Sequence, residues 1–305
     1  MQPIRMFSTT GSMAGAEPPL EGVLPIDKPA GPTSHDMVAR TRRALGTRRI
    51  GHTGTLDPFA SGLLLLCIGR ATRIAEYLSG MDKRYSAVVR LGVSTDTLDA
   101  SGTVTAEHDT TGLTRDAVEN ALALQRGNIL QLPPAYSAKK IRGERAYALA
   151  RQGREVDLEP VPVTIHDLTI TRFELPDVHL DVTCGSGTYI RAIARDLGDA
   201  LGVGAHLTAL RRTAVGPHSV HGAVTADELD TRPDRITEAM IPTLDALGAM
   251  PHIALSDDDV AHIRHGRAIV RDTDASGAVA LEAGGELVAI AEADAGRIRP
   301  RKVFL

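Results

Sequence analysis

Apolar and polar residues follow patterns along the chain that predict both strands and helices. Short apolar runs at 23–26 and 63–68 are typical of buried strands, and residues 178–184 alternate in the manner of a half-buried strand. In 34–45 and 189–201, by contrast, apolar residues recur at helical spacing. Helices and strands are therefore both present in the first two thirds of the chain.

The ends of these elements carry turn and capping signals. Ser34 is the predicted N-cap of the first helix, and Gly46 is placed to close it in the left-handed conformation. Further strands are predicted at 85–91 and 163–173, and a further helix at 72–78. The order shows no regular strand-helix-strand alternation, which favours an α+β fold with a mixed, largely antiparallel sheet flanked by helices.

A chain of 305 residues exceeds one average hydrophobic core, so we expect a large domain and a small one. Residues 1–21, rich in Ser, Thr, Gly and Pro, lack the apolar centre of a secretory signal and are predicted to form a flexible extension. The main domain is predicted at 22–245. A small module at 250–305 follows, with a polar helix at 256–265 and short strands that include 286–291.

Several classes of protein are disfavoured by composition. The longest purely apolar run, Leu63–Ile68, is far too short to cross a bilayer. The two cysteines, Cys67 and Cys184, lie in predicted strands, so neither a disulfide framework nor a cysteine zinc site is indicated and a reducing cytoplasm fits. His262 and His265 share a predicted helix but have no third metal ligand nearby.

Charge is segregated along the sequence. The net charge is −4, which alone argues weakly against a nucleic-acid partner. However, residues 22–95 hold eleven Lys or Arg against five Asp or Glu, and residues 131–154 hold six against one. With the basic tail 297–302, this predicts either one polyanion-binding face on an otherwise acidic protein or charges scattered over several unrelated surfaces.

The most unusual segment is residues 48–62. Its three glycines, hydroxyl side chains and one proline cannot form a regular element, so the segment must hold a particular loop shape. Asp57 precedes Pro58, which biases Asp57 towards an extended or turn conformation that projects its carboxylate. From the residues alone, Asp57 is either a turn-forming residue or a reactive group.

Residues 51–58, followed by 60–62, resemble the signature of the TruB family of pseudouridine synthases. Other blocks resemble the family in the family's order, namely 27–31, 83–85, 94–102, 131–140, 187–191 and 206–212. The resemblance covers about residues 23–216. It implies a pseudouridine synthase fold and an isomerase that needs neither a cofactor nor a metal.

The resemblance also implies roles for single residues. Asp57 matches the catalytic carboxylate, and Arg191 matches the arginine that keeps it ionised, for which a guanidinium can use two parallel hydrogen bonds. Tyr85 matches the aromatic residue that stacks on a flipped uracil. The alternatives are that Arg191 is an ordinary exposed helix arginine and that Tyr85 is a tyrosine of the core. Tyr189 and Leu210 either line the pocket or simply pack.

Further matches concern RNA binding. His52 corresponds to a histidine that fills the space left by the flipped base. Lys28 either contacts phosphate or supports the pocket, or it simply braces the turn at Asp27. The segment 131–155 resembles an insertion that closes on tRNA. Four basic side chains in it either bind phosphates or form a solvated face, namely Lys139, Lys140, Arg142 and Arg145.

The small module at 250–305 looks like a reduced, mostly β PUA-like domain with an RNA-binding role. Altogether the resemblance implies a cytoplasmic, monomeric tRNA pseudouridine synthase that acts on uridine 55 of the T-loop. Two other hypotheses stay open at this point. One is a guide-RNA-dependent relative that shares the Asp57 block, and the other is a non-catalytic RNA-binding protein on the same scaffold.

Overall fold

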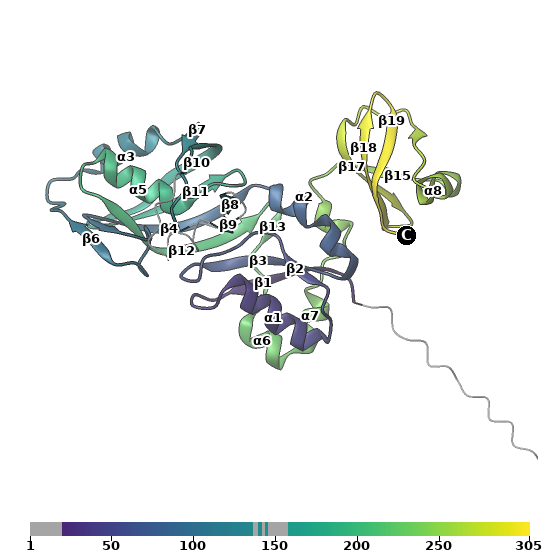
Figure 1. Cartoon of the computed structure of the whole chain (residues 1–305), viewed down its shortest axis with the longest axis horizontal. Helices are drawn as coiled ribbons and strands as arrows, with labels where there is room; N and C mark the ends of the chain where they lie inside the picture. Colours follow the sequence, from purple (N-terminus) through teal and green to yellow (C-terminus); the bar gives the residue numbers. More distant parts are fainter. Residues whose placement is uncertain (1–19, 137–139, 142–143, 146–157) are drawn as a thin grey trace, which may run out of the picture.

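A computed structural model describes residues 20–136, 140–141, 144–145 and 158–305, and the predicted extension at 1–21 lies almost entirely outside them. The described residues form a large mixed sheet with helices and a smaller sheet near the C-terminus (Figure 1). The predicted α+β class is therefore confirmed. Within the described ranges, no helix combines the length and apolar character needed to span a bilayer.

The large sheet has the strand order β14-β1-β3-β12-β4-β11-β10-β7. β1 pairs in parallel with β14, and β3 with β12, whereas the other ladders in this order are antiparallel. The bounds of its strands are β1 Gly22–Lys28, β2 Ile50–His52, β3 Ser61–Ile68, β4 Lys83–Leu91, β7 Gly127–Gln131, β10 Val161–Glu174, β11 Asp177–Cys184, β12 Ala205–Val215, β13 His218–Ser219 and β14 Val224–Thr225.

Helices cover the sheet in two groups. In Figure 1, α3 and α5 lie together at the β10–β11 end, whereas α1, α6 and α7 lie together by β1 and β3. The helix bounds are α1 Ser34–Leu45, η1 Gly69–Ile74, α2 Ala75–Gly80, α3 Arg115–Ala123, α5 Ile190–Ala200, α6 Ala226–Thr231, α7 Pro233–Glu238, η2 Asp245–Leu247 and α8 Asp257–Arg264. Two short hairpins complete this part of the chain, β5 Val93–Thr95 with β6 Val104–Glu107, and β8 Lys140–Ile141 with β9 Glu144–Arg145.

Strand β3 lies at the centre of the hydrophobic core. Leu64 and Leu66 belong to the cluster that contains the buried face of α1, whereas Leu63 and Leu65 belong to a second cluster with η1 and α2. Because successive side chains of a strand point to opposite faces, a strand covered on both sides must be apolar throughout. The run of leucines predicted as a buried strand is confirmed.

Helix α1 begins one residue earlier than its predicted N-cap implies. Thr33, not Ser34, is the N-cap, and it forms a capping box with Asp36. Ser34 is buried instead, and its hydroxyl bonds the backbone of Leu56. The predicted end is confirmed, since Gly46 has φ 61° in the left-handed region.

The C-terminal sheet has the order β15-β17-β18-β19-β16. The basic tail of the sequence forms strand β19 of this sheet. The apolar pattern did not predict this strand. The bounds are β15 His252–Ala254, β16 Ile269–Val270, β17 Gly277–Ala283, β18 Glu286–Asp294 and β19 Arg297–Val303.

The C-terminal sheet shares a core with the large domain. Phe304, Ile290 and Leu287 belong to the same buried cluster as Leu78 of α2. Polar contacts add to this interface, because Arg73 donates to the Val303 carbonyl and its guanidinium lies 4.7 Å from the centre of the Phe304 ring. The limits of the two domains, 22–245 and 250–305, stay a prediction about folding units.

Substituting Phe304 should destabilise the whole chain. The Phe304 side chain is 4% exposed, so Phe304→Ala should lower the free energy of unfolding by about 3–5 kcal/mol, because apolar burial is removed and a cavity is left. Leu305→Ala is the matched control, because Leu305 is 53% exposed and its truncation should change stability little. Urea unfolding followed by circular dichroism measures both, and equal stabilities would contradict a shared core.

Candidate active site

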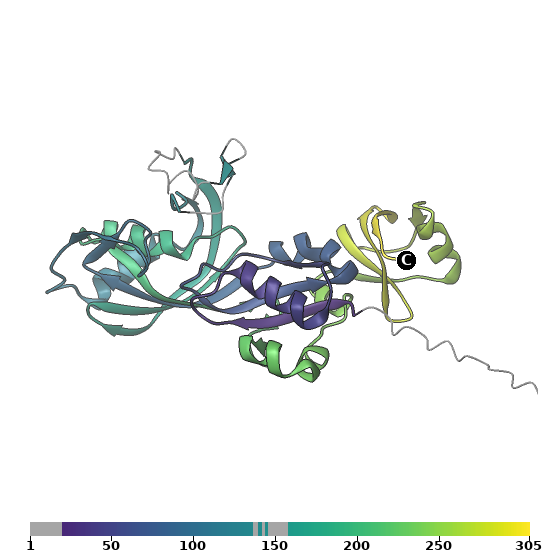
Figure 2. The same ribbon diagram turned by 60° about the horizontal axis from the view of Figure 1, so that its bottom comes forward.

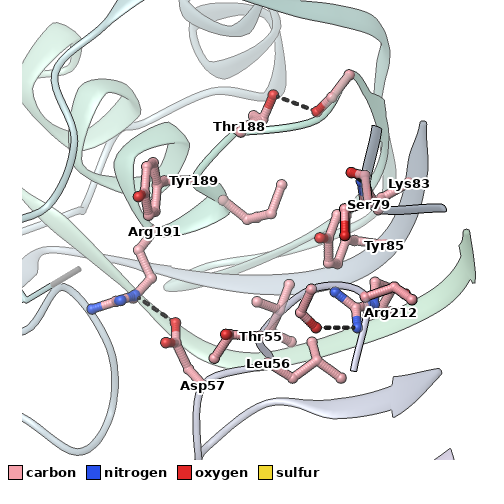
Figure 3. A pocket seen from close by; sticks show the side chains of 16 residues that line it. Thr55, Leu56, Asp57, Ser79, Lys83, Tyr85, Thr188, Tyr189, Arg191 and Arg212 are labelled. Carbon is pink, nitrogen blue, oxygen red and sulfur yellow. Dashed lines mark hydrogen bonds and ion pairs between the residues drawn. The ribbon is translucent and has the colours of Figure 1, made fainter. Parts of the chain in front are cut away.

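A pocket of about 280 Å³ opens where the loop after β2 meets β4, β12 and the start of α5. This volume is near the lower end of ligand pockets, so it suits a single ring system rather than an oligomer. Figure 3 shows Asp57, Tyr85 and Arg191 around it. Its lining consists of Thr53, Gly54, Thr55, Leu56, Asp57, Ser79, Lys83, Tyr85, Gly185, Gly187, Thr188, Tyr189, Ile190, Arg191, Leu210 and Arg212.

The loop that carries Asp57 is fixed by backbone hydrogen bonds. Leu56 N donates to the Ser34 hydroxyl at 2.8 Å, and the same hydroxyl donates to Leu56 O at 3.0 Å. Ala60 N donates to Asp57 O at 3.1 Å, which closes a turn over Pro58. A segment without regular secondary structure is thereby held in one shape, as its glycine and proline content predicted.

Lys28 supports this loop through hydrogen bonds to backbone carbonyl oxygens. Its side chain is fully buried, and its ammonium donates to Pro29 O and Pro32 O, each at 2.8 Å, and to Pro58 O at 3.4 Å. Burial lowers the pKa of Lys28 to about 8. Of its predicted roles, a phosphate contact is therefore wrong for this geometry, and bracing of the turn is what the contacts support.

Gly62 allows β3 and β12 to approach closely beside the loop. Its φ is +103°, and a Cβ there would lie 2.2 Å from the Arg212 carbonyl oxygen, so no other residue fits. The buried Arg212 side chain donates from Nε to Leu63 O at 2.7 Å and from Nη2 to Gly54 O at 3.1 Å. Arg212 thus ties the loop to the sheet, a role that the sequence analysis missed.

Asp57 and Arg191 form an ion pair at the edge of the pocket (Figure 3). Arg191 Nε lies 2.9 Å from Asp57 Oδ2, and the side chains of Arg191 and Asp57 are 5% and 37% exposed respectively. The contact uses a single guanidinium nitrogen, so the expectation of two parallel hydrogen bonds is wrong. The other nitrogens of Arg191 have different partners.

Arg191 of α5 connects two other segments to the Asp57 loop. Its Nη1 donates to Thr97 O at 2.8 Å and lies 3.5 Å from Asp99 Oδ2, while Nη2 donates to Tyr136 O at 2.8 Å. A guanidinium whose three nitrogens are all engaged is held in one orientation. The alternative of an exposed helix arginine is thus wrong for Arg191.

Asp99 is a second carboxylate that the sequence analysis did not single out. It is buried, and its Oδ1 accepts hydrogen bonds from Thr97 Oγ1 at 2.8 Å and from Ser101 N at 3.0 Å. Its block, 94–102, had been noticed only as a family match. Nothing in the spacing of Asp99 and Arg191 along the chain could show that the fold brings them together.

Opposing effects set the ionisation of Asp57. Burial raises the pKa of Asp57, the Arg191 guanidinium opposes this rise, and the negative charge of Asp99 adds to it. The net effect is a pKa above the ordinary value. The Asp57 carboxylate is consequently more basic than a surface aspartate, although Arg191 still favours its ionised form.

Tyr85 projects from β4 into the pocket between Lys83 and Arg212 (Figure 3). Burial raises the pKa of Tyr85, so its phenol stays neutral. Lys83 is buried, and its ammonium donates to Ser79 O and Met81 O, each at 2.6 Å. Lys83 therefore positions the end of α2 against the pocket, another contribution that the sequence analysis missed.

Tyr189 and Leu210 both line the pocket, which agrees with one of the two alternatives predicted for these residues. The backbone of Tyr189 is held by the buried side chain of Gln131, which accepts from Tyr189 N at 2.8 Å and donates to Tyr189 O at 3.2 Å. Gln131 is the first residue of the predicted insertion. The insertion and the start of α5 are therefore joined at their bases.

Of the other predicted RNA contacts, His52 is not among the residues that line the pocket. His52 is half-buried in β2, and its ring centre lies 5.3 Å from that of the exposed His35. Lys140 pairs with Arg145 across the β8–β9 hairpin, which stands off the large sheet in Figure 2. Lys139 and Arg142 lie outside the described residues. The roles of these residues in RNA binding stay predictions.

Removing the Arg191 charge should raise the pKa of Asp57 further. In Arg191→Met the main effect that opposes burial and the Asp99 charge is lost and the weaker effect of Lys28 remains, so the carboxylate should take up its proton at a higher pH than in the wild type. A ¹³C NMR titration of the aspartate carboxyls measures this. Arg195→Met is the control, because Arg195 lies one helix turn away and pairs with Asp196 instead. An unchanged or lower Asp57 pKa in Arg191→Met would contradict the pairing.

Three family models match consecutive parts of the chain. Residues 42–190 match the N-terminal domain of the TruB family pseudouridylate synthases, and residues 191–247 match the C-terminal domain of tRNA pseudouridylate synthase B. Residues 251–304 match the C-terminal model of pseudouridine synthase II TruB.

Whole-length relatives agree with these models. A protein named tRNA pseudouridine synthase B from Azoarcus sp. (strain BH72) is 44% identical over 286 residues, which are 93% of this chain and 95% of the relative. The protein of the same name from Thermobifida fusca (strain YX) is 45% identical over 294 residues, 93% of this chain and 98% of the relative.

Solved structures show the same fold. A crystal structure of a Cbf5-Nop10-Gar1 complex contains a chain with TM-score 0.72 and 28% identity, covering 93% of this chain and 85% of that one. An H/ACA RNP bound to a substrate RNA containing 2′-deoxyuridine contains a chain with TM-score 0.71 and 26% identity, at the same coverage. With family models and curated relatives that match along almost its entire length, the chain belongs to the TruB family of pseudouridine synthases, an isomerase family.

Proposed function

We propose that the protein converts uridine 55 in the T-loop of tRNA to pseudouridine, with Asp57 as the catalytic nucleophile. The observation that carries the proposal is the Asp57–Arg191 ion pair at the edge of a pocket that also contains Tyr85. The names of the relatives, tRNA pseudouridine synthase B, support tRNA as the substrate.

The reaction is an isomerisation in which atoms and electrons balance within the nucleotide. The bond from ribose C1′ to uracil N1 breaks, the uracil turns, and a bond from C1′ to C5 forms, while the C5 proton is released and N1 gains one. A carboxylate that adds to ribose C1′ or to the base at C6 can open this route by covalent catalysis. Asp57, held by Arg191 and raised in basicity by burial, is the group for this step.

A uridine in a folded RNA loop must leave its stack before Asp57 can reach it. Tyr85 offers an aromatic face for the extruded uracil, a contact worth about 1–3 kcal/mol. Leu210 and Tyr189 contribute further walls of the same pocket. These three side chains hold the base, whereas Asp57 attacks the nucleotide at C1′ of the ribose or at C6 of the base.

Binding of the rest of the tRNA falls to groups outside the pocket. We assign His52 to the space vacated by the base, and the four basic residues of the insertion to backbone phosphates, which position an RNA without reading its sequence. The base of the insertion reaches the pocket through Gln131 and Tyr136, which contact Tyr189 and Arg191. Closure of the insertion on tRNA would therefore act directly on the residues around Asp57.

Replacing the Asp57 carboxylate should abolish turnover and spare binding. Asp57→Asn keeps the shape of the side chain but removes its negative charge, so pseudouridine should no longer form in unmodified tRNA while the affinity for tRNA stays close to that of the wild type. Pseudouridine mapping after incubation without any added guide RNA or protein measures turnover, and filter binding measures affinity. Activity retained by Asp57→Asn would disprove the nucleophile, and a wild type that needs a guide RNA would favour the guide-dependent hypothesis.

As the pH is lowered, activity should begin to fall at a higher pH than an ordinary aspartate would give. The reactive form of Asp57 is the carboxylate, and its pKa is raised, so the protonated and inactive form accumulates at a higher pH than for an ordinary aspartate of pKa 3.8. The acidic limb of kcat/KM for tRNA should therefore lie above that value. Affinity for tRNA measured at the same pH values is the control, and a limb at or below the ordinary value would contradict the proposal.

A further inference from the structure

Arg212 places a buried positive charge in the wall of the pocket without an acidic partner. Its side chain is 3% exposed, and no salt bridge within the described ranges involves it. Its Nε and Nη2 donate to the carbonyl oxygens of Leu63 and Gly54, which are neutral acceptors. A buried charge is normally paired, because removing an ion from water is costly. A counter-charge for Arg212 therefore has to come from the contents of the pocket.

Lys83 adds a second positive charge to the same wall. Its ammonium is buried like the guanidinium of Arg212, and its acceptors, Ser79 O and Met81 O, are neutral as well. Burial lowers the pKa of Lys83 to about 8, and the charge of Arg212 contributes to this lowering. The two cations therefore repel each other, and a negative charge in the pocket beside them would relieve the repulsion.

Arg212 lies directly opposite Tyr85 in the sheet. The two residues are register partners of β12 and β4, so their Cβ atoms are about 4.5–5.5 Å apart, and both side chains line the pocket (Figure 3). Burial raises the pKa of Tyr85, whereas the charge of Arg212 and its hydrogen bond to the phenol oppose this rise. A guanidinium has five N–H donors, so donors remain for a ligand. A uracil stacked on Tyr85 would therefore have the guanidinium next to it.

The proposed reaction puts a negative charge on the uracil. When the bond from C1′ to N1 breaks, its electron pair stays with the base, and the detached uracil anion shares the charge among N1, O2 and O4. When a carboxylate adds to C6 instead, the charge moves to O4 as an enolate. On both routes, a fixed cation beside the base stabilises the charged state more than the neutral uridine, which is how an enzyme accelerates a reaction.

We propose that Arg212 is a second catalytic residue, which stabilises the negative charge of the uracil, with Lys83 as an auxiliary cation. The inference rests on the proposed function, because it takes uridine as the substrate. Arg212 donates hydrogen bonds to a uracil oxygen and keeps all its protons. On the route through C1′, the base loses its charge when C5 bonds to C1′ and the Asp57 carboxylate leaves. Release of the C5 proton and protonation of N1 then complete the product.

The test removes the charge of Arg212 and varies how readily the base carries a negative charge. Arg212→Gln is neutral, and Arg212→Lys keeps a positive charge. Arg90→Gln is the control, because Arg90 lies on β4 but not in the pocket lining and pairs with Asp177. The substrates are tRNAs with uridine or 4-thiouridine at position 55, and sulfur accepts negative charge more readily than oxygen. Single-turnover rate constants at saturating enzyme and dissociation constants are measured at pH 7.

Arg212→Gln should lower the rate constant on uridine by about 10²–10³-fold and change the dissociation constant little, because the bound uridine is neutral. Its loss of rate on 4-thiouridine should be clearly smaller. Arg212→Lys and Arg90→Gln should keep the wild-type ratio of the two rate constants. An equal loss on both substrates in Arg212→Gln would give Arg212 a purely structural role and overturn the proposal, as would a wild-type rate in that variant.

A pH series keeps the proposal testable if circular dichroism shows that Arg212→Gln does not fold. The ammonium of Arg212→Lys is buried beside Lys28 and Lys83, whose pKa values are both lowered to about 8, so it should lose its proton in the same range, whereas a guanidinium stays charged. The rate of Arg212→Lys on uridine, relative to the wild type, should therefore fall as the pH rises through about 8, and less so on 4-thiouridine. Asp57 and Tyr85 also face this position, but they are present in both proteins. A relative rate that stays constant with pH contradicts the proposal.

The same measurements separate this inference from the proposed function. A folded wild type that forms no pseudouridine in tRNA refutes the proposed function, and this inference with it. An active wild type whose two rate constants respond equally to the loss of the Arg212 charge refutes only the inference.

Discussion

The structure depends on a single buried guanidinium. Arg191 contacts Asp57 through Nε, Thr97 and Asp99 through Nη1, and Tyr136 through Nη2. Because a guanidinium is planar and cannot lose its proton in a protein, these contacts fix four chain segments relative to one another. An error in any segment would leave a buried charge or carbonyl without its partner, which is costly. The candidate active site is thus also a place where four segments of the chain are joined.

Other buried cations hold segments around the pocket in place, as Arg191 does. Lys28, Lys83 and Arg212 are each almost inaccessible to solvent, and each donates to backbone carbonyl oxygens of neighbouring loops. Carbonyl acceptors orient these cations while leaving much of their positive charge uncompensated. Of these cations, Lys28 acts on Asp57, and together with Arg191 it favours the ionised carboxylate against the effects of burial and of Asp99.

The C-terminal sheet is linked to a wall of the pocket. The C-terminal sheet is joined to η1 and α2 by a common apolar cluster and by Arg73, and the end of α2 is in turn held by Lys83 beside the pocket. The C-terminal sheet is therefore connected to a wall of the pocket through η1 and α2.

Local sequence patterns were enough to predict the strands and helices with strong periodicity and the irregular loop that carries Asp57. A run such as Leu63–Ile68 has one stable placement, between two apolar layers, and the dipeptide of Asp57 and Pro58 restricts its own backbone. Strand β19 escaped prediction because its basic residues alternate without an apolar period, and the cap of α1 was misplaced by one residue because Thr33 and Ser34 are both good caps.

The pairing of charged side chains, by contrast, is set by the folded structure. Asp57, Asp99 and Arg191 are far apart along the chain, and nothing local records that Arg191 gives one nitrogen to each carboxylate. Lys28 could equally have faced solvent, yet the fold buries it against the carbonyl oxygens of three prolines. Hydrophobic period is a property of neighbours in sequence, whereas the pairing of buried charges depends on distances that exist only once the sheet has formed.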